Sequence, residues 1–238
     1  MKYKKTIGCF LAVVCSALSA KAQGFQNLDF ESASPVSAGN PNDPTQDTFT
    51  SALPGWSGLI GGTPATTVEF NNFSLGGPSI DLFGPGWNSV NPGIIDGSYT
   101  VFLQSGGIPG PSDDVSLLQS GTIPPTAESL QLKAWSASSV DSAFSVSLNG
   151  TALSLIALSS GQTSAGQMFT EYGANIPSYA GASAQLTLTS IATGAPSWTE
   201  FDDITFSTQA VPEASPFVLS GIGGLLFALY RRFAPKRE

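Results

Sequence analysis

Short runs in which apolar and polar residues alternate recur through the middle of the chain, and no segment there repeats its apolar residues at helical spacing. A period of two places successive side chains on opposite faces of a strand, so each run predicts a half-buried β-strand. The clearest runs are 98–104, 115–118, 130–135, 144–148, 151–156, 168–172, 185–190 and 201–206, with shorter candidates at 28–30 and 68–70. Short strands in this number predict an all-β domain built as a two-sheet sandwich.

The dipeptide Asn149-Gly150 separates two of these runs, 144–148 and 151–156. Both central residues of a type I′ turn need a positive φ, which Asn and Gly adopt at low cost. We therefore predict a β-hairpin here, with the apolar side chains of its first strand facing the core.

Glycine and proline are abundant between residues 23 and 210, where 22 Gly and 14 Pro occur among 188 residues. This content argues against helices of any length. The densest stretch, residues 32–98, is also crowded with Asn and Asp, so we expect it to be rich in loops. Such loops often carry the binding residues of a β scaffold, although many only decorate it.

Charge is distributed unevenly along the chain. Eight of the nine basic residues lie near the two ends, and between residues 23 and 210 a single lysine, Lys133, faces 15 acidic residues, a formal charge of 1 − 15 = −14. A surface with this charge cannot neutralise a row of phosphates, so nucleic-acid binding is excluded.

The middle of the chain also lacks several kinds of reactive side chain. The sequence contains no histidine, and its two cysteines are Cys9 and Cys15. A His-based triad, a thiolate nucleophile and a metal site with nitrogen or sulfur ligands are therefore excluded there. Carboxylate, hydroxyl, amide and aromatic chemistry remains.

The first 22 residues have the three parts of a secretory signal peptide. Lysines at positions 2, 4 and 5 precede an apolar stretch at 6–18, and small residues flank Lys21 at Ala20 and Ala22. We expect signal peptidase to cut after Ala22, which leaves a body without cysteine or disulfide in an oxidising compartment. An uncleaved anchor is disfavoured because the stretch is shorter than the roughly 20 residues of a membrane span.

The last 28 residues also have three parts: a short polar motif, an apolar stretch at 216–230 and a basic cluster. The apolar stretch predicts one marginal transmembrane helix, about 22 Å long against a hydrocarbon core of about 30 Å. The basic cluster would stay cytoplasmic. The residues of the motif and the first arginines of the cluster are Val211, Pro212, Glu213, Ala214, Arg231 and Arg232.

This tail, 211–238, resembles the PEP-CTERM sorting signal of Gram-negative and related bacteria, which a membrane protease called exosortase recognises. The resemblance implies a stage anchored in the inner membrane and a cut near Pro212-Glu213. It further implies release to the outer surface or the exopolysaccharide matrix.

Five short motifs in the middle of the chain occur in a characteristic order. They are NLDFE at 27–31, LPGW at 53–56, DGSY at 96–99, VSLNG at 146–150 and WTEFDDI at 198–204. Together they resemble galactose-binding-like jelly rolls, a fold that several carbohydrate-binding modules share. The resemblance implies a jelly-roll sandwich over residues 23–210 with neighbouring first and last strands. In that group a structural calcium is often held between these strands, here by Glu31 with Asp202 or Asp203.

The residues around Asp202-Asp203 give a second reason to consider a cation. Alternation fails between Phe201 and Ile204, where two apolar residues flank two adjacent carboxylates, so we expect a bulge or kink. Calcium accepts carboxylate and backbone oxygens from such irregular strands. Solvated acids at the end of a strand are the alternative interpretation.

Sugar binding would need aromatic faces with polar side chains nearby. The candidates are Trp56 and Trp87, which lie in Gly/Pro-rich segments where an exposed ring is plausible, together with Asp96 and Tyr99. Packing in the core or anchoring of a loop is the alternative role for each tryptophan.

These features predict an exported surface or matrix protein whose domain is a non-catalytic binding module for carbohydrate. A purely structural biofilm or envelope protein without a ligand is one alternative. A carboxylate-dependent polysaccharide hydrolase is another, but adjacent acids such as Asp113-Asp114 face opposite sides of a strand and cannot flank one bond. We therefore expect no enzymatic activity.

Overall fold

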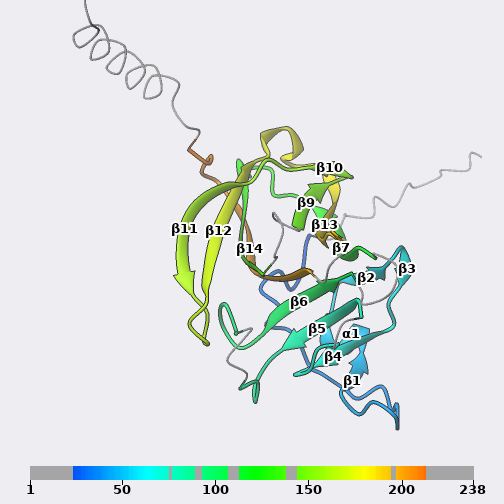
Figure 1. Cartoon of the computed structure of the whole chain (residues 1–238). Coiled ribbons are helices and arrows are strands. Elements are labelled where there is room, and N and C mark those ends of the chain that lie inside the picture. The colour runs from blue at the N-terminus through cyan, green and yellow to red at the C-terminus, as the bar shows by residue number, and fades with distance from the viewer. Residues whose placement is uncertain are drawn as a thin grey trace, which may run out of the picture.

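The protein is built of two β-sheets that pack face to face as a sandwich (Figure 1). The computed structural model describes residues 24–74, 77–88, 93–106, 113–137, 144–193 and 197–212. Within these residues the helical content is one α-helix of four residues, α1 (Phe49–Ala52), and one 3-10 turn, η1 (Pro177–Tyr179). The expectation of an all-β, two-sheet sandwich is confirmed.

The larger sheet has eight strands, and all neighbours run antiparallel except the parallel pair β4 and β5. In spatial order the strands are β1 (Gln46–Thr48), β4 (Thr67–Phe70), β5 (Ser79–Phe83), β6 (Thr100–Ser105), β14 (Ser197–Ser207), β8 (Ser129–Ala137), β12 (Met168–Asn175) and β11 (Ile156–Gln162).

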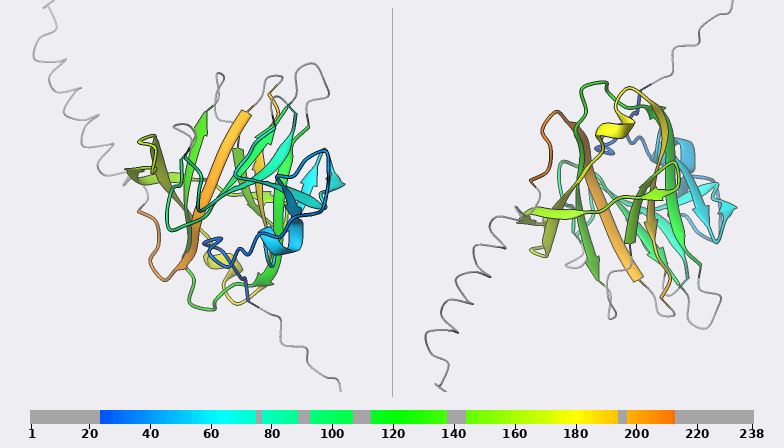
Figure 2. Two further views of the ribbon diagram at one scale, coloured as in Figure 1. Left: turned by 90° about the horizontal axis from the view of Figure 1, so that it is seen from below. Right: turned by 90° about the horizontal axis from the view of Figure 1, so that it is seen from above.

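The smaller sheet has six strands, all antiparallel to their neighbours. In spatial order they are β10 (Thr151–Ala152), β9 (Phe144–Leu148), β13 (Ser183–Ser190), β7 (Val115–Thr122), β2 (Ser57–Ile60) and β3 (Thr63–Pro64). The views along the sandwich show the two layers and the N-terminal segment that crosses one end of them (Figure 2).

The core lies between the sheets and is lined by the alternating apolar residues of both. Leu186 and Leu188 of β13 face it from the smaller sheet, and Leu132 of β8 and Phe201 of β14 face it from the larger one. All four side chains have no exposed surface. Burial of this apolar surface is the main term that stabilises the sandwich.

The hairpin at Asn149-Gly150 is confirmed. β9 ends at Leu148, β10 begins at Thr151, and these two residues are paired across the turn. The φ angles of Asn149 and Gly150 are +50° and +76°, as a type I′ turn requires. The Asn149 side chain also links the turn to β13, because its Oδ1 accepts a hydrogen bond of 2.8 Å from Gln185 N.

Three sequence predictions about strands are wrong. The first and last strands, β1 and β14, are not neighbours, because β4, β5 and β6 lie between them in the larger sheet. Residues 28–30 form a turn, and 151–156 is divided between the short β10 and the start of β11. The region 32–98 is also more ordered than its composition suggested, because it contains β1 to β5. In β5 the sequence Ser79-Ile80-Asp81-Leu82 alternates over four residues, but the strand lies within the Gly- and Pro-rich region and all five of its residues are buried.

The described fold begins and ends close to the two expected processing positions. Gly24, which follows Ala22 by two residues, forms a parallel bridge with Thr122. At the other end Val211 is 3% exposed, and Asn175 binds its backbone twice, through Val211 N to Oδ1 at 2.7 Å and Nδ2 to Val211 O at 3.2 Å. The expected signal peptide 1–22 and the expected helix 216–230 lie outside the described residues, and within those residues no helix is long and apolar enough to cross a bilayer.

Gly58 of β2 is expected to tolerate no side chain. A Cβ at this position would lie 2.5 Å from the Phe49 ring and 2.5 Å from Ile80 Cδ1. Gly58→Ala should therefore lower the free energy of unfolding by about 1–3 kcal/mol, the usual cost of an overpacked core. Urea unfolding measures the change. Gly24→Ala is the matched control, because a Cβ there meets nothing within 4 Å, and equal stability of the two variants would contradict this packing.

Candidate functional site

The candidate site lies beside a bulge in β14, the strand between β6 and β8 in the larger sheet. Asp202 is paired with Lys133 of β8, the next pair along the strand joins Thr205 to Gln131, and the register shifts between Asp202 and Thr205. Asp203 has a φ of +44°, an uncommon value for a residue with a side chain. The expectation of a bulge at Asp202-Asp203 is confirmed.

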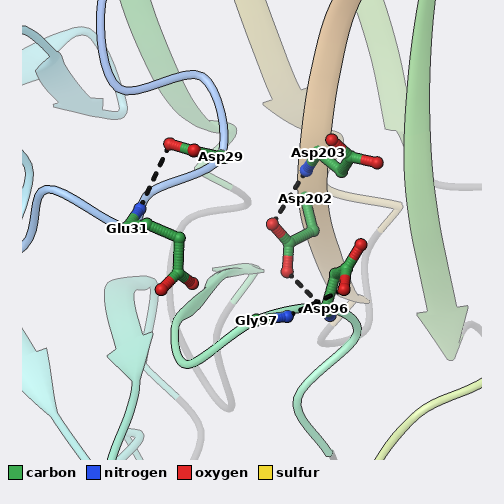
Figure 3. Close-up of a pocket in the computed structure, with 6 residues that line it drawn as sticks. All are labelled: Asp29, Glu31, Asp96, Gly97, Asp202 and Asp203. Carbon is green, nitrogen blue, oxygen red and sulfur yellow. Dashed lines mark hydrogen bonds between the residues drawn. The ribbon is translucent and has the colours of Figure 1, made fainter.

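Three segments far apart in sequence meet at this bulge and enclose a hollow of about 220 Å³ (Figure 3). The N-terminal turn, the segment before β6 and β14 each contribute acidic side chains. The lining residues are Asp29, Glu31, Asp96, Gly97, Asp202 and Asp203. The structure therefore brings together Glu31, Asp202 and Asp203, the residues that the sequence singled out for calcium, with Asp96 beside them.

Glu31 ties the N-terminal turn to the segment before β6. Its Oε1 accepts hydrogen bonds from Ser98 N at 2.7 Å and Tyr99 N at 2.8 Å. Gly97 makes this approach possible: its φ is +56°, and a Cβ there would collide with the Glu31 carboxylate. The same turn is held to β14 by a backbone hydrogen bond of 3.0 Å from Ile204 N to Leu28 O.

Asp202 is the buried member of the site, with 1% of its surface exposed. Its Oδ2 accepts hydrogen bonds from Thr100 Oγ1 at 2.5 Å and Asp96 N at 3.1 Å, and its Oδ1 accepts one from Asp203 N at 2.8 Å. Burial raises the pKa of Asp202 to about 8, against the lowering effect of these hydrogen bonds.

Lys133 supplies the positive charge of the site. Its ammonium group forms ion pairs with Asp96 Oδ2 and, at 2.9 Å, with Asp203 Oδ2. Partial burial lowers the pKa of Lys133, but the hydrogen bonds to the two carboxylates outweigh that effect and leave the pKa raised. The bond from Lys133 in turn lowers the pKa of Asp96. Both acids are more than a third exposed, so each ion pair contributes at most about 1 kcal/mol.

In the observed side-chain positions, the acidic residues around the hollow are arranged to pair with the Lys133 ammonium group and not to coordinate a divalent cation. Calcium needs six to eight converging oxygens, and the described residues contain no group of three or more acidic, His or Cys side chains placed to hold a metal. Lys133 already occupies the space between Asp96 and Asp203 as an ion-pair partner of both. Calcium at Glu31, Asp202 and Asp203 stays a prediction of the family resemblance.

The four candidate sugar-binding residues do not form one site. Trp56 is 5% exposed, its ring centre lies 5.6 Å from that of Phe30, and its Nε1 donates a hydrogen bond of 2.9 Å to Asn27 O. The expectation of an exposed ring at Trp56 is therefore wrong: the indole fixes the N-terminal segment against the core.

Trp87 and Tyr99 are half-buried. Trp87 stacks on Phe83 of β5 with ring centres 4.1 Å apart and an interplanar angle of 13°. Tyr99 lies where Gly84 leaves room for its ring, because a Cβ on that glycine would be 2.5 Å from Tyr99 Cε1. Only Asp96, which is exposed, lines the acidic hollow.

The sequence analysis missed a second set of carboxyls on the outer face of the larger sheet. Asp81 of β5 and Glu200 of β14 have no exposed surface, and the register places Phe102 between them. One oxygen of Asp81 and both oxygens of Glu200 have no hydrogen-bond partner. Burial raises both pKa values well above their ordinary range, and the charge of Asp202 adds to the shift of Glu200. Alternation places polar residues such as Asp81 on a solvated face, and it cannot report that other parts of the fold cover that face.

Comparisons with known proteins do not identify this site: the chain matches no protein-family model, and neither the curated proteins nor the solved structures show a significant similarity to it. Of the expected sorting residues, Val211 and Pro212 are described, whereas Glu213, Ala214, Arg231 and Arg232 lie outside the described residues.

The buried carboxyls predict that the protein is more stable at pH 5 than at pH 8. A carboxyl with a raised pKa keeps its proton in the folded state while the unfolded chain releases it above about pH 4, so stability falls as pH rises toward the folded pKa. Each such group contributes a slope of about 1.4 kcal/mol per pH unit. Glu200→Gln should reduce this slope, because it removes the titrating group without removing any hydrogen bond.

Urea unfolding at several pH values between 5 and 8 measures the slope. Glu128→Gln, at an exposed position, serves as the matched control and should behave as the wild type. A Glu200→Gln protein with the wild-type slope would show that Glu200 is ionised in the folded state.

The role of Lys133 predicts how the protein responds to calcium. With the lysine present, excess EGTA should leave the melting temperature unchanged. Lys133→Gln should melt a few degrees lower, and added calcium should raise its melting temperature more than that of the wild type, because Asp96 and Asp203 have lost their counter-charge. A wild-type protein that melts earlier in EGTA would instead support a resident calcium ion.

Proposed function

We propose that this chain is an exported protein of the bacterial cell surface or exopolysaccharide matrix, and that its β-sandwich is a jelly roll of the galactose-binding-like type. In this proposal signal peptidase removes residues 1–22, and an exosortase recognises the tail while it is anchored in the inner membrane. The remaining domain is a non-catalytic module that binds carbohydrate.

The observation that carries this proposal is the position of the folded body between the two expected cuts. Among the described residues, the first pairing is at Gly24, which follows Ala22 by two residues, and Val211, directly before Pro212-Glu213, is bound by Asn175. Every strand of the two sheets lies between these two positions. Both ends can therefore be removed without losing a strand of either sheet. The sandwich also contains no cysteine in its described residues, so it needs no disulfide to fold.

The state of the carboxyls supports a non-catalytic role. Glycoside hydrolysis needs two carboxyl groups that flank one bond and are open to substrate. Glu200 and Asp202 are buried, and Asp203 is paired with Lys133. Asp114, in the other adjacent pair, accepts a hydrogen bond of 2.7 Å from Ala192 N. Asp202, Asp203 and Asp114 hold segments of the fold together, and the buried Glu200 is not open to a substrate.

Export and processing are tested by mass spectrometry of the protein recovered from an exosortase-bearing Gram-negative host. We expect an N-terminus at Gln23 and a C-terminus near Pro212, with the product in the surface or matrix fraction. Glu213→Ala should leave the tail uncut, whereas the matched variant Glu128→Ala should be processed normally. An intact chain in the cytosol would contradict the proposal.

Carbohydrate binding is tested separately, with the processed protein in gels that contain neutral polysaccharide. Retarded migration in at least one polysaccharide supports a binding module. A protein that is exported and cut correctly but is not retarded by any polysaccharide supports the purely structural role. Release of sugar from any of the polysaccharides would instead support the alternative of a hydrolase.

A further inference from the structure

The two sheets are bridged by an aromatic pair near the side where β10 and β11 are the edge strands. Phe144 opens β9 in the smaller sheet, and Tyr172 lies within β12 in the larger one. Their rings meet edge to face, with centres 5.6 Å apart at 68°. Phe144 is fixed from behind by a second edge-to-face contact with Phe201 at 5.4 Å. Both bridging rings are half-buried, so part of each stays open to solvent.

Two hollows flank this pair, and both are lined by Phe144 and Tyr172. One, of about 250 Å³, lies over the end of β8 and the start of β12 and is also lined by Ala134, Trp135, Ser136, Met168 and Thr170. The other, of about 260 Å³, lies along β9 and the segment that leads to β11 and is also lined by Ser145, Val146, Leu153 and Leu155. The aromatic pair is thus a wall shared by two neighbouring recesses.

The lining of both hollows differs from the rest of the domain. Among the residues that the structure describes, it contains no Asp, Glu, Lys or Arg, although acidic residues greatly outnumber basic ones between residues 23 and 210. It combines aromatic and aliphatic surface with the hydroxyls of Ser136, Ser145 and Thr170. A recess of this kind disfavours an ionic ligand and suits a neutral one that has both apolar faces and hydroxyls.

One hydroxyl at the first hollow lacks a partner. Ser136 Oγ is buried and makes no hydrogen bond with the protein. Pairing places Ser136 opposite Thr199 of β14, and alternation along β8 puts it on the same face as Ala134, toward the other sheet. Burial of an unpaired hydroxyl is unfavourable. This Oγ has almost no accessible surface in this rotamer, so a ligand hydroxyl would satisfy it once the Ser136 side chain turns toward the hollow.

Met168 adds exposed apolar surface at the rim of the same hollow. Its side chain is 57% exposed, and among the described residues only Met168 and Val36 are large hydrophobics with this degree of exposure. Val36 lines none of the described hollows. An exposed thioether beside aromatic rings provides an adaptable surface for the apolar face of a ring-shaped ligand.

We propose that this cleft, defined by the two hollows on either side of Phe144 and Tyr172, binds two adjacent rings of a neutral polysaccharide. Each hollow is smaller than a typical pocket for a whole small molecule, and the two share Phe144 and Tyr172 as a common wall. The proposal rests on the carbohydrate-binding function above and assigns it to a surface distinct from Trp56, Trp87, Asp96 and Tyr99.

The test uses the processed, exported protein in affinity electrophoresis, with xyloglucan, galactomannan and mixed-linkage β-glucan as neutral probes and alginate as the anionic one. The wild type should be retarded by at least one neutral probe and not by alginate. Ser136→Ala and Met168→Ala should each weaken the apparent affinity by about three- to tenfold, the effect of one lost contact. Val36→Ala is the matched control for Met168→Ala and should bind as the wild type.

The three variants should also melt within a few degrees of the wild type, because neither Ser136 nor the exposed side chains carry a hydrogen bond of the fold. Wild-type affinity in both Ser136→Ala and Met168→Ala would overturn the assignment to this cleft while leaving a binding module in place. A wild type that no neutral probe retards would overturn the cleft proposal as well, independently of the export and processing result.

Discussion

The fold depends on the burial of both faces of β14. This strand lies fourth from one edge of the eight-stranded sheet, paired with β6 and β8. Its inward residue Phe201 contributes to the core between the sheets, whereas Glu200 and Asp202 point to the opposite face and are also covered. Burial of a carboxyl group destabilises the fold unless the group is neutral or hydrogen-bonded. Each carboxyl on this face must therefore either receive hydrogen bonds from the segments that cover it or keep its proton. Both solutions occur: Asp202 receives three hydrogen bonds, and Glu200 receives none and has a strongly raised pKa.

The acidic hollow follows from this arrangement. At the bulge, the first carboxyl, Asp202, is buried on the outer face of the sheet, and the second, Asp203, lies beside Lys133. The segment before β6 crosses the bulge because Asp96 N and Thr100 Oγ1 donate hydrogen bonds to Asp202. The N-terminal turn is attached to this same segment, because Glu31 accepts hydrogen bonds from two of the segment's backbone N–H groups. The cluster is thus mainly a joint between three segments, with a lysine as its internal counter-ion. For this reason the uncharged cleft is the better candidate for a ligand site.

The sequence predicted those parts of the structure that follow from local rules. Asn149-Gly150 specified a tight hairpin through its φ preferences, and the loss of alternation around Asp202-Asp203 indicated the bulge. The meeting of Glu31 with these acids was implied by the family resemblance. Lys133 could also have been assigned to the acidic cluster from the sequence, because electrostatic attraction favours ion pairs between a single basic residue and some of the 15 acidic residues around it.

Other parts depend on tertiary contacts that no local pattern reports. The alternation of Ser79-Ile80-Asp81-Leu82 in β5 indicates a strand with a solvated outer face, yet Asp81 on that face is fully buried. Trp56 lies in a Gly/Pro-rich segment typical of an exposed loop, yet its indole packs against Phe30 from the N-terminal turn. The cleft at Phe144 and Tyr172 joins two sheets, so its residues are neighbours only after the sandwich closes.

Amide hydrogen exchange of the processed protein can establish whether β14 holds the larger sheet together. The amides of Thr199, Phe201 and Ile204 should exchange only through global unfolding, as slowly as the protected amides of β6 and β8 and more slowly than those of the edge strands β1 and β11. If β14 exchanges as fast as these edge strands, its burial on both faces is not what stabilises the fold, and the acidic hollow does not arise from that burial.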